Sequence, residues 1–440
     1  MRLSLFRALE RVSDWRRRQA AGASLAAAAA AGGVRARAPV GADASLWVFA
    51  STIGEVHAIE PFLDRLRQEM GNPPLTLISD RSTYDDAYRA KYPQAQIEQL
   101  DGSSAQVEAL LARNPPRMLL VAEIPALLHD APCRFSFATQ HAARRAGASI
   151  VLVNGWLYGY PPPSRLDRIE NRWFAREYAA GFDLALVQGE AVRQALIAAG
   201  ADLARVHVTG NIKFDAMDGF AASAAEAPLA RALAARRQGH GGPLLVAGSV
   251  TESDHQRDVI DAFSKLRQQE PRAQLVLAPR HPEHKPRMST LRSMLEASGL
   301  AFHYRSRVSL EEAASCDLLV LDTMGELRGC YAVADAAFVG VDHNVLEPLA
   351  YGTPTFVGPG WEPSYPSYPV YMHLTNAQLL SPVPSLESLG TAWQSHFSSA
   401  PEDSGAARAR IRAVLRAQCG AVERGLKALR EAGLITRARD

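Results

Sequence analysis

Residues 318–359 read LLVLDTMGELRGCYAVADAAFVGVDHNVLEPLAYGTPTFVGP, a stretch in which short apolar runs alternate with helical patterns. The pattern predicts three strands and two helices, in the order strand Leu318–Leu321, helix Glu326–Val333, strand Ala336–Gly340, helix 344–352 and strand Thr355–Val357. Strands that alternate with helices form a parallel sheet, and ligands bind at the carboxyl ends of its strands. The loops that follow these strands are therefore the candidate binding loops.

Two of these loops carry groups suited to a nucleotide. Met324, Gly325 and Glu326 follow the first strand, and His343, Asn344 and Glu347 follow the second. Glycine lets the backbone approach a ligand closely, a helix that begins near Asn344 offers unpaired N–H groups to an anion, and Glu347 is placed to accept from two ribose hydroxyls. An ordinary turn, with Glu347 as an acidic residue that complements the helix dipole, explains the same residues. Both interpretations stay open on this stretch alone.

The stretch as a whole resembles the 3-deoxy-D-manno-octulosonic acid (Kdo) transferases, glycosyltransferases that add Kdo to lipid A precursors. The matching segments, in order, are DTMGEL, YAVADAAFVG, HNVLEPLAYGTP and FVGP. The resemblance extends over roughly residues 47–359 and implies the α/β fold called GT-B, two Rossmann-like domains whose parallel sheets face a cleft between them. It also implies a CMP-activated donor, with Met324, Gly325, Asn344 and Glu347 around cytidine and ribose and Glu326 beside them.

Length and composition agree with two soluble domains. The chain has 440 residues, and single cores stop growing at about 250–300 residues. A net charge of +2 argues against a basic nucleic-acid-binding face, so no nucleic acid is expected as a partner. The four cysteines, Cys133, Cys316, Cys330 and Cys419, lack the paired spacing of a zinc site and predict free thiols in a reducing cytoplasm. We expect no metal and no cofactor besides the CMP-sugar co-substrate.

Composition along the chain predicts five segments. They are a basic, Ala-rich arm (1–44), an N-terminal acceptor domain (45–220), a linker (221–242), a C-terminal donor domain (243–404), and a C-terminal helix that packs back on the first domain (405–440). The linker is predicted because residues 221–237 are Ala-rich with little apolar periodicity and QGHGG follows them.

The sequence of the arm predicts contact with a membrane surface. Residues 1–40 hold eight arginines against two acidic residues, and apolar side chains recur among them at helical spacing, namely Leu3, Leu5, Phe6, Leu9 and Trp15. Such a helix can lie on an anionic leaflet but cannot span one, and the following Ala-rich run is too weakly apolar to do so. The predicted location is peripheral, on the cytoplasmic face of the inner membrane. A disordered leader is the alternative.

Glu55 is the candidate general base. The strand 45–50 leads through STIGE into a helical pattern, which places Glu55 at a helix N-terminus. The positive end of the helix favours its ionised form, as a base that takes a proton from an acceptor hydroxyl requires. A glutamate that simply caps its helix is the alternative. STIGE stands where the family has S-V-G-E, and the resemblance implies that Glu55 is the base.

Glu123 and Lys213 also match family segments. Glu123 follows the predicted strand 118–121 at the second acid of the family's E-T-E-(I/L)-W-P, where it would orient acceptor or base; capping a helix is the alternative. Lys213 lies in GNIKFD, which resembles G-N-x-K-(F/Y)-D, and would offset donor charge; a surface ion pair with Asp215 is the alternative.

The second domain adds three candidate donor residues. Gly248 and Ser249 lie in GSVTE, which resembles the family's G-S-T-x-x-(E/G) and offers N–H groups and a hydroxyl to a phosphate. Arg280 lies in the matching segment PRHPE and has a fork of donors that suits a phosphate or a sugar carboxylate.

The acceptor side is less regular. Arginines and a tryptophan recur at helical spacing, namely Arg165, Arg168, Arg172, Trp173 and Arg176, and suit an anionic acceptor and its lipid surface. A solvated helix face paired with Asp167, Glu170 and Glu177 is the alternative. The chain also departs from the family pattern, with Phe49 in place of His, Val121 in place of an acid, Trp156 in place of Arg, and a loop shortened to Val341-Asp342.

The function predicted from the sequence is an inverting transfer of Kdo, or a related acidic sugar, from a CMP-sugar to a lipid A precursor or related glycolipid in lipopolysaccharide biosynthesis. Three alternatives remain. They are a transfer to an acceptor other than lipid A, a sugar-nucleotide epimerase on a similar fold, and a catalytically silent scaffold.

Overall fold

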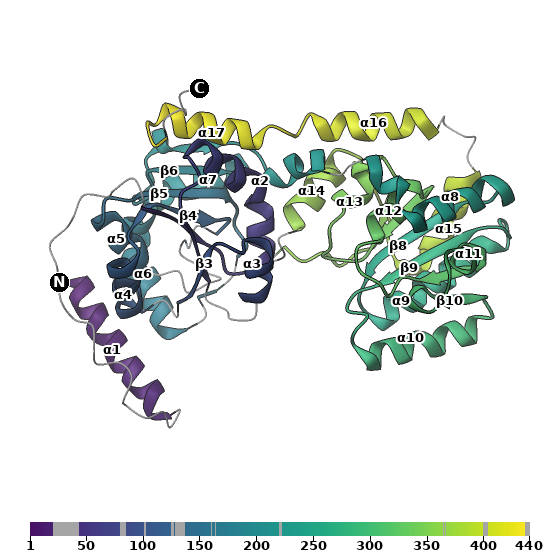
Figure 1. Cartoon of the computed structure of the whole chain (residues 1–440), viewed down its shortest axis with the longest axis horizontal. Helices are drawn as coiled ribbons and strands as arrows, with labels where there is room; N and C mark the ends of the chain where they lie inside the picture. Colours follow the sequence, from purple (N-terminus) through teal and green to yellow (C-terminus); the bar gives the residue numbers. More distant parts are fainter. Residues whose placement is uncertain are drawn as a thin grey trace. The chain divides into compact units, whose positions relative to one another are not determined.

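The structure is a computed structural model. It describes residues 1–20, 44–79, 85–100, 103–124, 127, 137–159, 161–162, 164–219, 222–363, 365, 367–398 and 404–435. The chain forms two compact units, of which unit 1 comprises Met1–Asp215 with Cys419–Asp440 and unit 2 comprises Ala216–Gln418 (Figure 1).

Unit 1 is built on a parallel sheet of seven strands in the order β3-β2-β1-β4-β5-β6-β7. The strands are β1 (Ser45–Phe49), β2 (Leu75–Ser79), β3 (Gln96–Gln99), β4 (Pro116–Ala122), β5 (Ser149–Gly155), β6 (Leu184–Val187) and β7 (Val206–Val208). The helices are α1 (Arg2–Ala20), α2 (Ile53–Glu69), α3 (Asp85–Lys91), α4 (Ser104–Arg113), α5 (Phe137–Arg145), α6 (Arg165–Ala179), α7 (Glu190–Ala199) and α17 (Ala421–Glu431), with short 3-10 turns η2 (Leu203–Arg205) and η3 (Ile212–Gly219).

Alternation along the strands explains why this sheet is covered on both faces. Trp47 and Phe49 of β1 point into a core shared with α4, α5, α6 and α7, whereas Leu46 and Val48 point into a core shared with α2, α3 and α17. A strand that is apolar on both faces must be buried on both, which is the pattern of a parallel sheet between two helix layers.

Unit 2 repeats the architecture, with strand order β10-β11-β9-β8-β12-β13-β14. The strands are β8 (Leu244–Val250), β9 (Gln274–Pro279), β10 (Phe302–Tyr304), β11 (Leu318–Val320), β12 (Ala336–Val339), β13 (Thr355–Val357) and β14 (Leu380–Pro382). The helices are η4 (Ala222–Glu226), α8 (Pro228–His240), α9 (Ser253–Arg267), α10 (Lys285–Ser298), η5 (Arg305–Arg307), α11 (Leu310–Ser315), α12 (Leu327–Val333), α13 (Leu346–Ala350), α14 (Tyr368–Asn376), η6 (Leu386–Ser388), α15 (Leu389–Ser398) and α16 (Ser404–Arg416). Helices α9, α10 and α15 share one core and α8, α11 and α12 the other.

The linker expected at 221–242 is instead a folded part of unit 2. Residues 228–240 form α8, whose Leu229 and Leu233 are fully buried in the core. Alanines complete its apolar face, among them Ala230, and small side chains give a weak periodicity in the sequence although they pack closely. The division between the units falls at Asp215 and Ala216.

The C-terminal segment also differs from the expected single helix on the first domain. Gly420 adopts a left-handed φ of 96° and separates two helices. The first, α16, belongs to unit 2 and packs against α13, where Arg408 donates to the carbonyl of Tyr351 at 3.2 Å. Only α17 packs against α2 in unit 1. The C-terminal segment therefore forms two helices, one in each unit.

The first part of the predicted arm is a docked helix. In α1, Phe6 is buried with its ring edge-on to Phe174 of α6 at 5.7 Å, and Glu10 is buried where it accepts from Ser104 at the start of α4. A disordered leader is therefore wrong for residues 2–20, while residues 21–43 lie outside the part that the structure describes.

Candidate functional site

The strand order identifies where a ligand crevice opens in each sheet. In unit 1 the first strand, β1, lies between β2 and β4, and in unit 2 the first strand, β8, lies between β9 and β12. In each sheet, the strands on the two sides of the first strand continue toward opposite edges. The carboxyl end of the first strand is therefore the switch point of the sheet. Ligands of open α/β sheets bind at this point, beyond the carboxyl ends of the strands.

Backbone strain is concentrated at the same ends. Seven non-glycine residues in the described part of the chain have a left-handed φ, and five of them lie at or just beyond the carboxyl ends of β4, β5, β8, β9 and β12. These five are Glu123, Asn154, Ser249, His281 and Asp342. Each costs about 1–3 kcal/mol and persists only where the surrounding structure enforces it, as at ligand sites. Geometry thus singles out the loops that the sequence motifs occupy.

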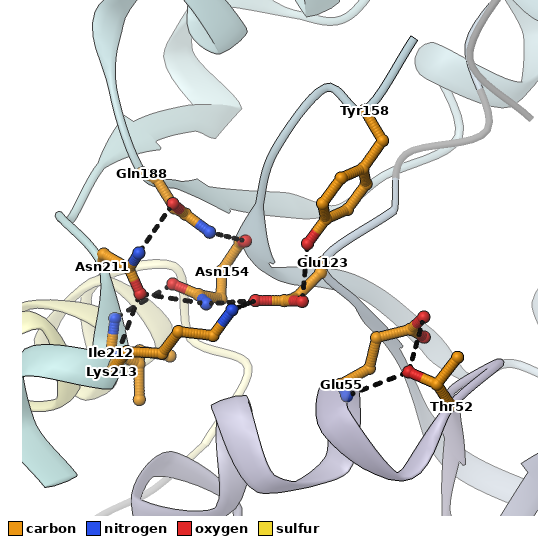
Figure 2. A network of polar contacts seen from close by, with 9 residues as sticks. All are labelled: Thr52, Glu55, Glu123, Asn154, Tyr158, Gln188, Asn211, Ile212 and Lys213. Atoms are coloured by element: carbon orange, nitrogen blue, oxygen red, sulfur yellow. Dashed lines mark hydrogen bonds and ion pairs between the residues drawn. The ribbon is translucent and has the colours of Figure 1, made fainter. Parts of the chain in front are cut away.

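In unit 1 the strained residues hold a buried carboxylate network (Figure 2). Glu123 has no exposed surface. Its Oε1 accepts from Asn154 Nδ2 at 2.9 Å and pairs with Lys213 Nζ at 3.2 Å, while its Oε2 accepts from the Tyr158 hydroxyl at 2.7 Å. A buried carboxylate is stable only with such partners. In this state Glu123 holds the loops around it and presents no surface to a substrate.

Further amides extend the network to the GNIKFD segment. Asn154 Oδ1 accepts from the backbone N–H of Ile212 at 3.0 Å, and Asn211 Nδ2 donates to Gln188 Oε1 at 2.9 Å. Sequence reasoning did not select Asn154, Tyr158, Gln188 or Asn211 as site residues. The available signal was that each lies at or just beyond the carboxyl end of a strand.

Asp215 has a different role from the one considered for it. Its two carboxylate oxygens accept from the backbone N–H groups of Gly420 and Val422, each at 2.6 Å, and so cap α17. The alternative considered for Lys213, a surface ion pair with Asp215, is therefore wrong, because Lys213 pairs with Glu123.

Glu55 lies in the first turn of α2, at the carboxyl end of β1 (Figure 2). Its Oε2 accepts from the backbone N–H of Ser51 at 2.7 Å and its Oε1 from the Thr52 hydroxyl at 3.2 Å, while its own N–H donates to Thr52 Oγ1 at 3.3 Å. Glu55 thus makes the contacts of a capping residue, and the same contacts fix its carboxylate at the crevice. The side chain is 4% exposed.

In unit 2, Gly248 and Ser249, the residues expected to bind a phosphate, lie where the backbone packs closely. A Cβ on Gly340 would lie 2.2 Å from the carbonyl oxygen of Ser249, and one on Gly248 would lie 1.7 Å from the Tyr331 hydroxyl. Neither position accepts a side chain. The end of β8 therefore sits directly against the end of β12, and Arg280, exposed just beyond the end of β9, completes the group of three adjacent strand ends.

A contact between two side chains joins the loops that follow β8 and β12. Thr251 Oγ1 lies 2.9 Å from His343 Nε2. Burial, followed by the charges of Arg280 and His281, lowers the pKa of His343 to about 4. Its imidazole is therefore neutral at physiological pH.

Asn344 and Glu347, which are expected around the nucleoside, follow His343 in the chain. Burial raises the pKa of Glu347, opposed by Arg328, whose Nε is 3.6 Å away, and by Asn344. The helix expected to begin near Asn344 begins at Leu346. Asn344, two residues earlier, accepts through Oδ1 from the N–H of Leu346 at 3.1 Å.

The other loop of the expected nucleoside site presents mainly backbone and one apolar side chain. Met324 is 86% exposed, and Gly325 has a φ of 89°. Glu326 accepts from the Thr323 hydroxyl and from Arg305 Nε, the latter at 3.2 Å.

On α6, the arginines at 165, 168, 172 and 176 are exposed and Trp173 is half-buried. The acidic partners considered for them serve elsewhere, since Glu170 is buried and Glu177 pairs with Arg2 of α1 at 3.6 Å. Asp167 binds the cap residue Ser164. Within the described residues no acidic side chain pairs with these four arginines.

Two Rossmann-like units with polar loops at the strand ends define the GT-B class that the sequence predicted. Solved structures of this fold match over most of the chain. The UDP complex of MnaA from S. aureus has a TM-score of 0.58 and 14% identity, covering 90% of this chain and 99% of its own. A UDP-GlcNAc 2-epimerase from Neisseria meningitidis has a TM-score of 0.58 and 12% identity, covering 88% and 99%. At such identities the likeness shows the fold alone.

Comparison with related sequences identifies the family. The family described as 3-Deoxy-D-manno-octulosonic-acid transferase (kdotransferase) matches residues 14–216. The 3-deoxy-D-manno-octulosonic acid transferase of Bordetella pertussis is 32% identical over 371 residues, 78% of each chain, and that of Chlamydia trachomatis serovar A is 27% identical over 330 residues, 71% of this chain and 70% of its own. The chain belongs to the Kdo transferase family and is a glycosyltransferase. No helix among the described residues is long and apolar enough to cross a membrane.

Proposed function

We propose that this transferase moves Kdo, or a related acidic sugar, from a CMP-activated donor to a hydroxyl of a lipid A precursor or related glycolipid, with inversion at the anomeric carbon. The observation that carries the proposal is Glu55, a carboxylate fixed at a helix N-terminus at the ligand end of β1 by Ser51 and Thr52. Such a group can take the proton of an acceptor hydroxyl.

The steps balance without a metal. As Glu55 takes the proton, the acceptor oxygen attacks the anomeric carbon from the face opposite the phosphate, the bond between that carbon and the phosphate oxygen breaks, and CMP leaves with the electron pair. The leaving phosphate gains charge, which Arg280 and the turn at Ser249 stabilise. Glu347, Asn344, Met324 and Gly325 hold cytidine and ribose.

Lys213 receives a revised role in this proposal. The sequence suggested that it offsets donor charge, but its ammonium lies 3.2 Å from the fully buried Glu123 carboxylate. The pair carries no net charge. We therefore assign Lys213 to holding Glu123, and through it the loops around the crevice of unit 1.

The test is incubation with CMP-Kdo and a panel of lipid A precursors, read by mass spectrometry. The expected product is a precursor heavier by one or more Kdo residues, formed by the native chain and reduced in Glu55→Gln. Release of CMP without any transfer product, or conversion of a nucleotide sugar alone, would contradict the proposal.

We also propose that α1 and α6 rest on an anionic membrane surface. With Phe6 and Glu10 turned inward, α1 exposes Leu5, Leu9, Val12 and Trp15 at 53%, 37%, 51% and 57%. These four positions share one side of the helix, and the exposed Arg11 and Arg16 lie beside them. Apolar side chains between arginines suit an interfacial helix.

The membrane proposal is tested by co-sedimentation with vesicles of phosphatidylglycerol and phosphatidylethanolamine. Leu5→Asp with Trp15→Asp should abolish binding, whereas Leu203→Asp, at another leucine that is 56% exposed, should leave it unchanged. Binding should also weaken as salt is raised, since screening acts on exposed charges. Equal sedimentation of the native chain and the double variant would contradict the proposal.

A further inference from the structure

His343 occupies a place in the crevice of unit 2 that none of the assigned roles explains. It follows β12 at the switch point, and its Nε2 is 2.9 Å from Thr251 Oγ1, which follows β8. The bridge therefore joins the two strand ends between which a ligand of this sheet binds.

The bridge also selects a tautomer. A neutral imidazole carries one proton, on either Nε2 or Nδ1. The Thr251 hydroxyl has a second available acceptor, the carbonyl of Ser249, but that oxygen is 3.5 Å away, at the limit of a hydrogen bond. When the Thr251 hydroxyl donates to Nε2, which at 2.9 Å is the nearer of the two acceptors, the ring proton is on Nδ1.

The surroundings of Nδ1–H favour an anionic oxygen. Burial, and then the positive charge of Arg280 just beyond the end of β9, disfavour a charged His343. No described residue hydrogen-bonds to Nδ1. An N–H donor that stays neutral beside an arginine adds a directed hydrogen bond to an anion without adding repulsion.

We propose that His343 donates Nδ1–H to an anionic oxygen of the CMP-sugar donor, and that Thr251 fixes the tautomer that makes this possible. The inference rests on the proposed function for the identity of the ligand. The oxygen belongs either to the CMP phosphate or to the carboxylate of the sugar, which share this chemistry. His343 acts as a binding group in this scheme and does not protonate the leaving group.

Two substitutions of His343 distinguish a role of Nδ1 from a role of Nε2. The amide nitrogen of His343→Asn is the same number of bonds from Cβ as Nδ1, whereas that of His343→Gln matches Nε2. Loss of one charge-assisted hydrogen bond weakens binding about 10- to 100-fold. Calorimetry should therefore show that His343→Gln weakens ligand binding by this factor while His343→Asn weakens it by less than about threefold. Thermal unfolding of each variant reports any loss of folding.

The affinities for cytidine, CMP and CMP-Kdo identify which oxygen of the donor accepts from His343 Nδ1–H. If the partner is the phosphate, His343→Gln weakens CMP and CMP-Kdo alike and leaves cytidine unchanged; if it is the sugar carboxylate, only CMP-Kdo weakens. Nitrogen-15 NMR of the native chain should show Nδ1 protonated and Nε2 bare, and Thr251→Val should remove this preference. Equal affinity of native and Gln variants for all three ligands, or a proton on Nε2, would overturn the inference. Failure of the native chain to bind CMP at all would instead overturn the proposed donor class.

Discussion

Replacing Lys213 by methionine tests whether the buried pair with Glu123 organises unit 1. Methionine keeps the apolar stem and removes the charge, which leaves a carboxylate with no exposed surface and without its cation. Removing one partner of a buried ion pair typically costs about 3–5 kcal/mol. Because the Lys213 side chain is 20% exposed, water reaches the pair, and we expect the lower end, about 3 kcal/mol.

The assay is a double-mutant cycle on thermal and denaturant unfolding. For a unit of this size, about 3 kcal/mol lowers the melting temperature of unit 1 by on the order of 10 °C. Glu123→Gln with Lys213→Met should recover most of the loss, because the neutral amide can accept from Asn154 through its oxygen and donate to the Tyr158 hydroxyl oxygen through its nitrogen.

The two roles of Lys213 give opposite results. If Lys213 holds Glu123, Lys213→Met lowers stability and CMP affinity stays within about twofold of the native chain. A variant that keeps its melting temperature within 2 °C but binds CMP about tenfold more weakly would refute the structural role and restore Lys213 to the donor site.

Three further outcomes are expected. Glu55→Gln should lower turnover about 10²–10⁴-fold with CMP affinity unchanged; a melting temperature that falls in parallel with activity would instead indicate that Glu55 only caps α2. Glu347→Ala should weaken CMP binding by about 1–3 kcal/mol in calorimetry, and unchanged affinity in the folded variant would remove Glu347 from the site. Burial raises the pKa of Glu10 above its ordinary value of 4.5, so its contribution to docking α1 is fully present below that value and is lost as the pH rises through the higher folded pKa. Hydrogen-exchange protection of α1 should therefore be greater at pH 5 than at pH 8, and Glu10→Gln should reduce the difference; protection that rises with pH would contradict this.

Much of the fold followed from the sequence because apolar runs in a parallel sheet are short and clearly bounded. Strand Thr355–Val357 has the predicted bounds, and the GT-B class is confirmed. The edge strand β3 was not predicted, since Gln-Ile-Glu-Gln is half-exposed and carries no apolar run. Helix α8 was interpreted as linker because alanines form much of its buried face.

Sequence motifs selected single residues of the candidate site but did not predict how they are arranged. Glu123 was selected from a motif, yet its partners Asn154, Tyr158 and Lys213 come from later strands and loops that only the sheet order brings together. The neutral state of His343 likewise depends on burial and on Arg280, which is 63 positions earlier in the chain. Such properties arise from topology, and no local pattern encodes them.

The departures from the family pattern on the acceptor side have unequal consequences once their burial is known. Phe49 and Val121 are buried in the core shared with α4 to α7, so these two changes alter packing beneath the crevice and expose nothing to a ligand. Trp156 differs, because it is half-buried just beyond the end of β5 and its N–H has no hydrogen-bond partner in the described part of the chain. A large apolar ring with an unused donor replaces the fixed charge of an arginine. Of these departures, Trp156 is therefore the one expected to change what the crevice of unit 1 presents to an acceptor.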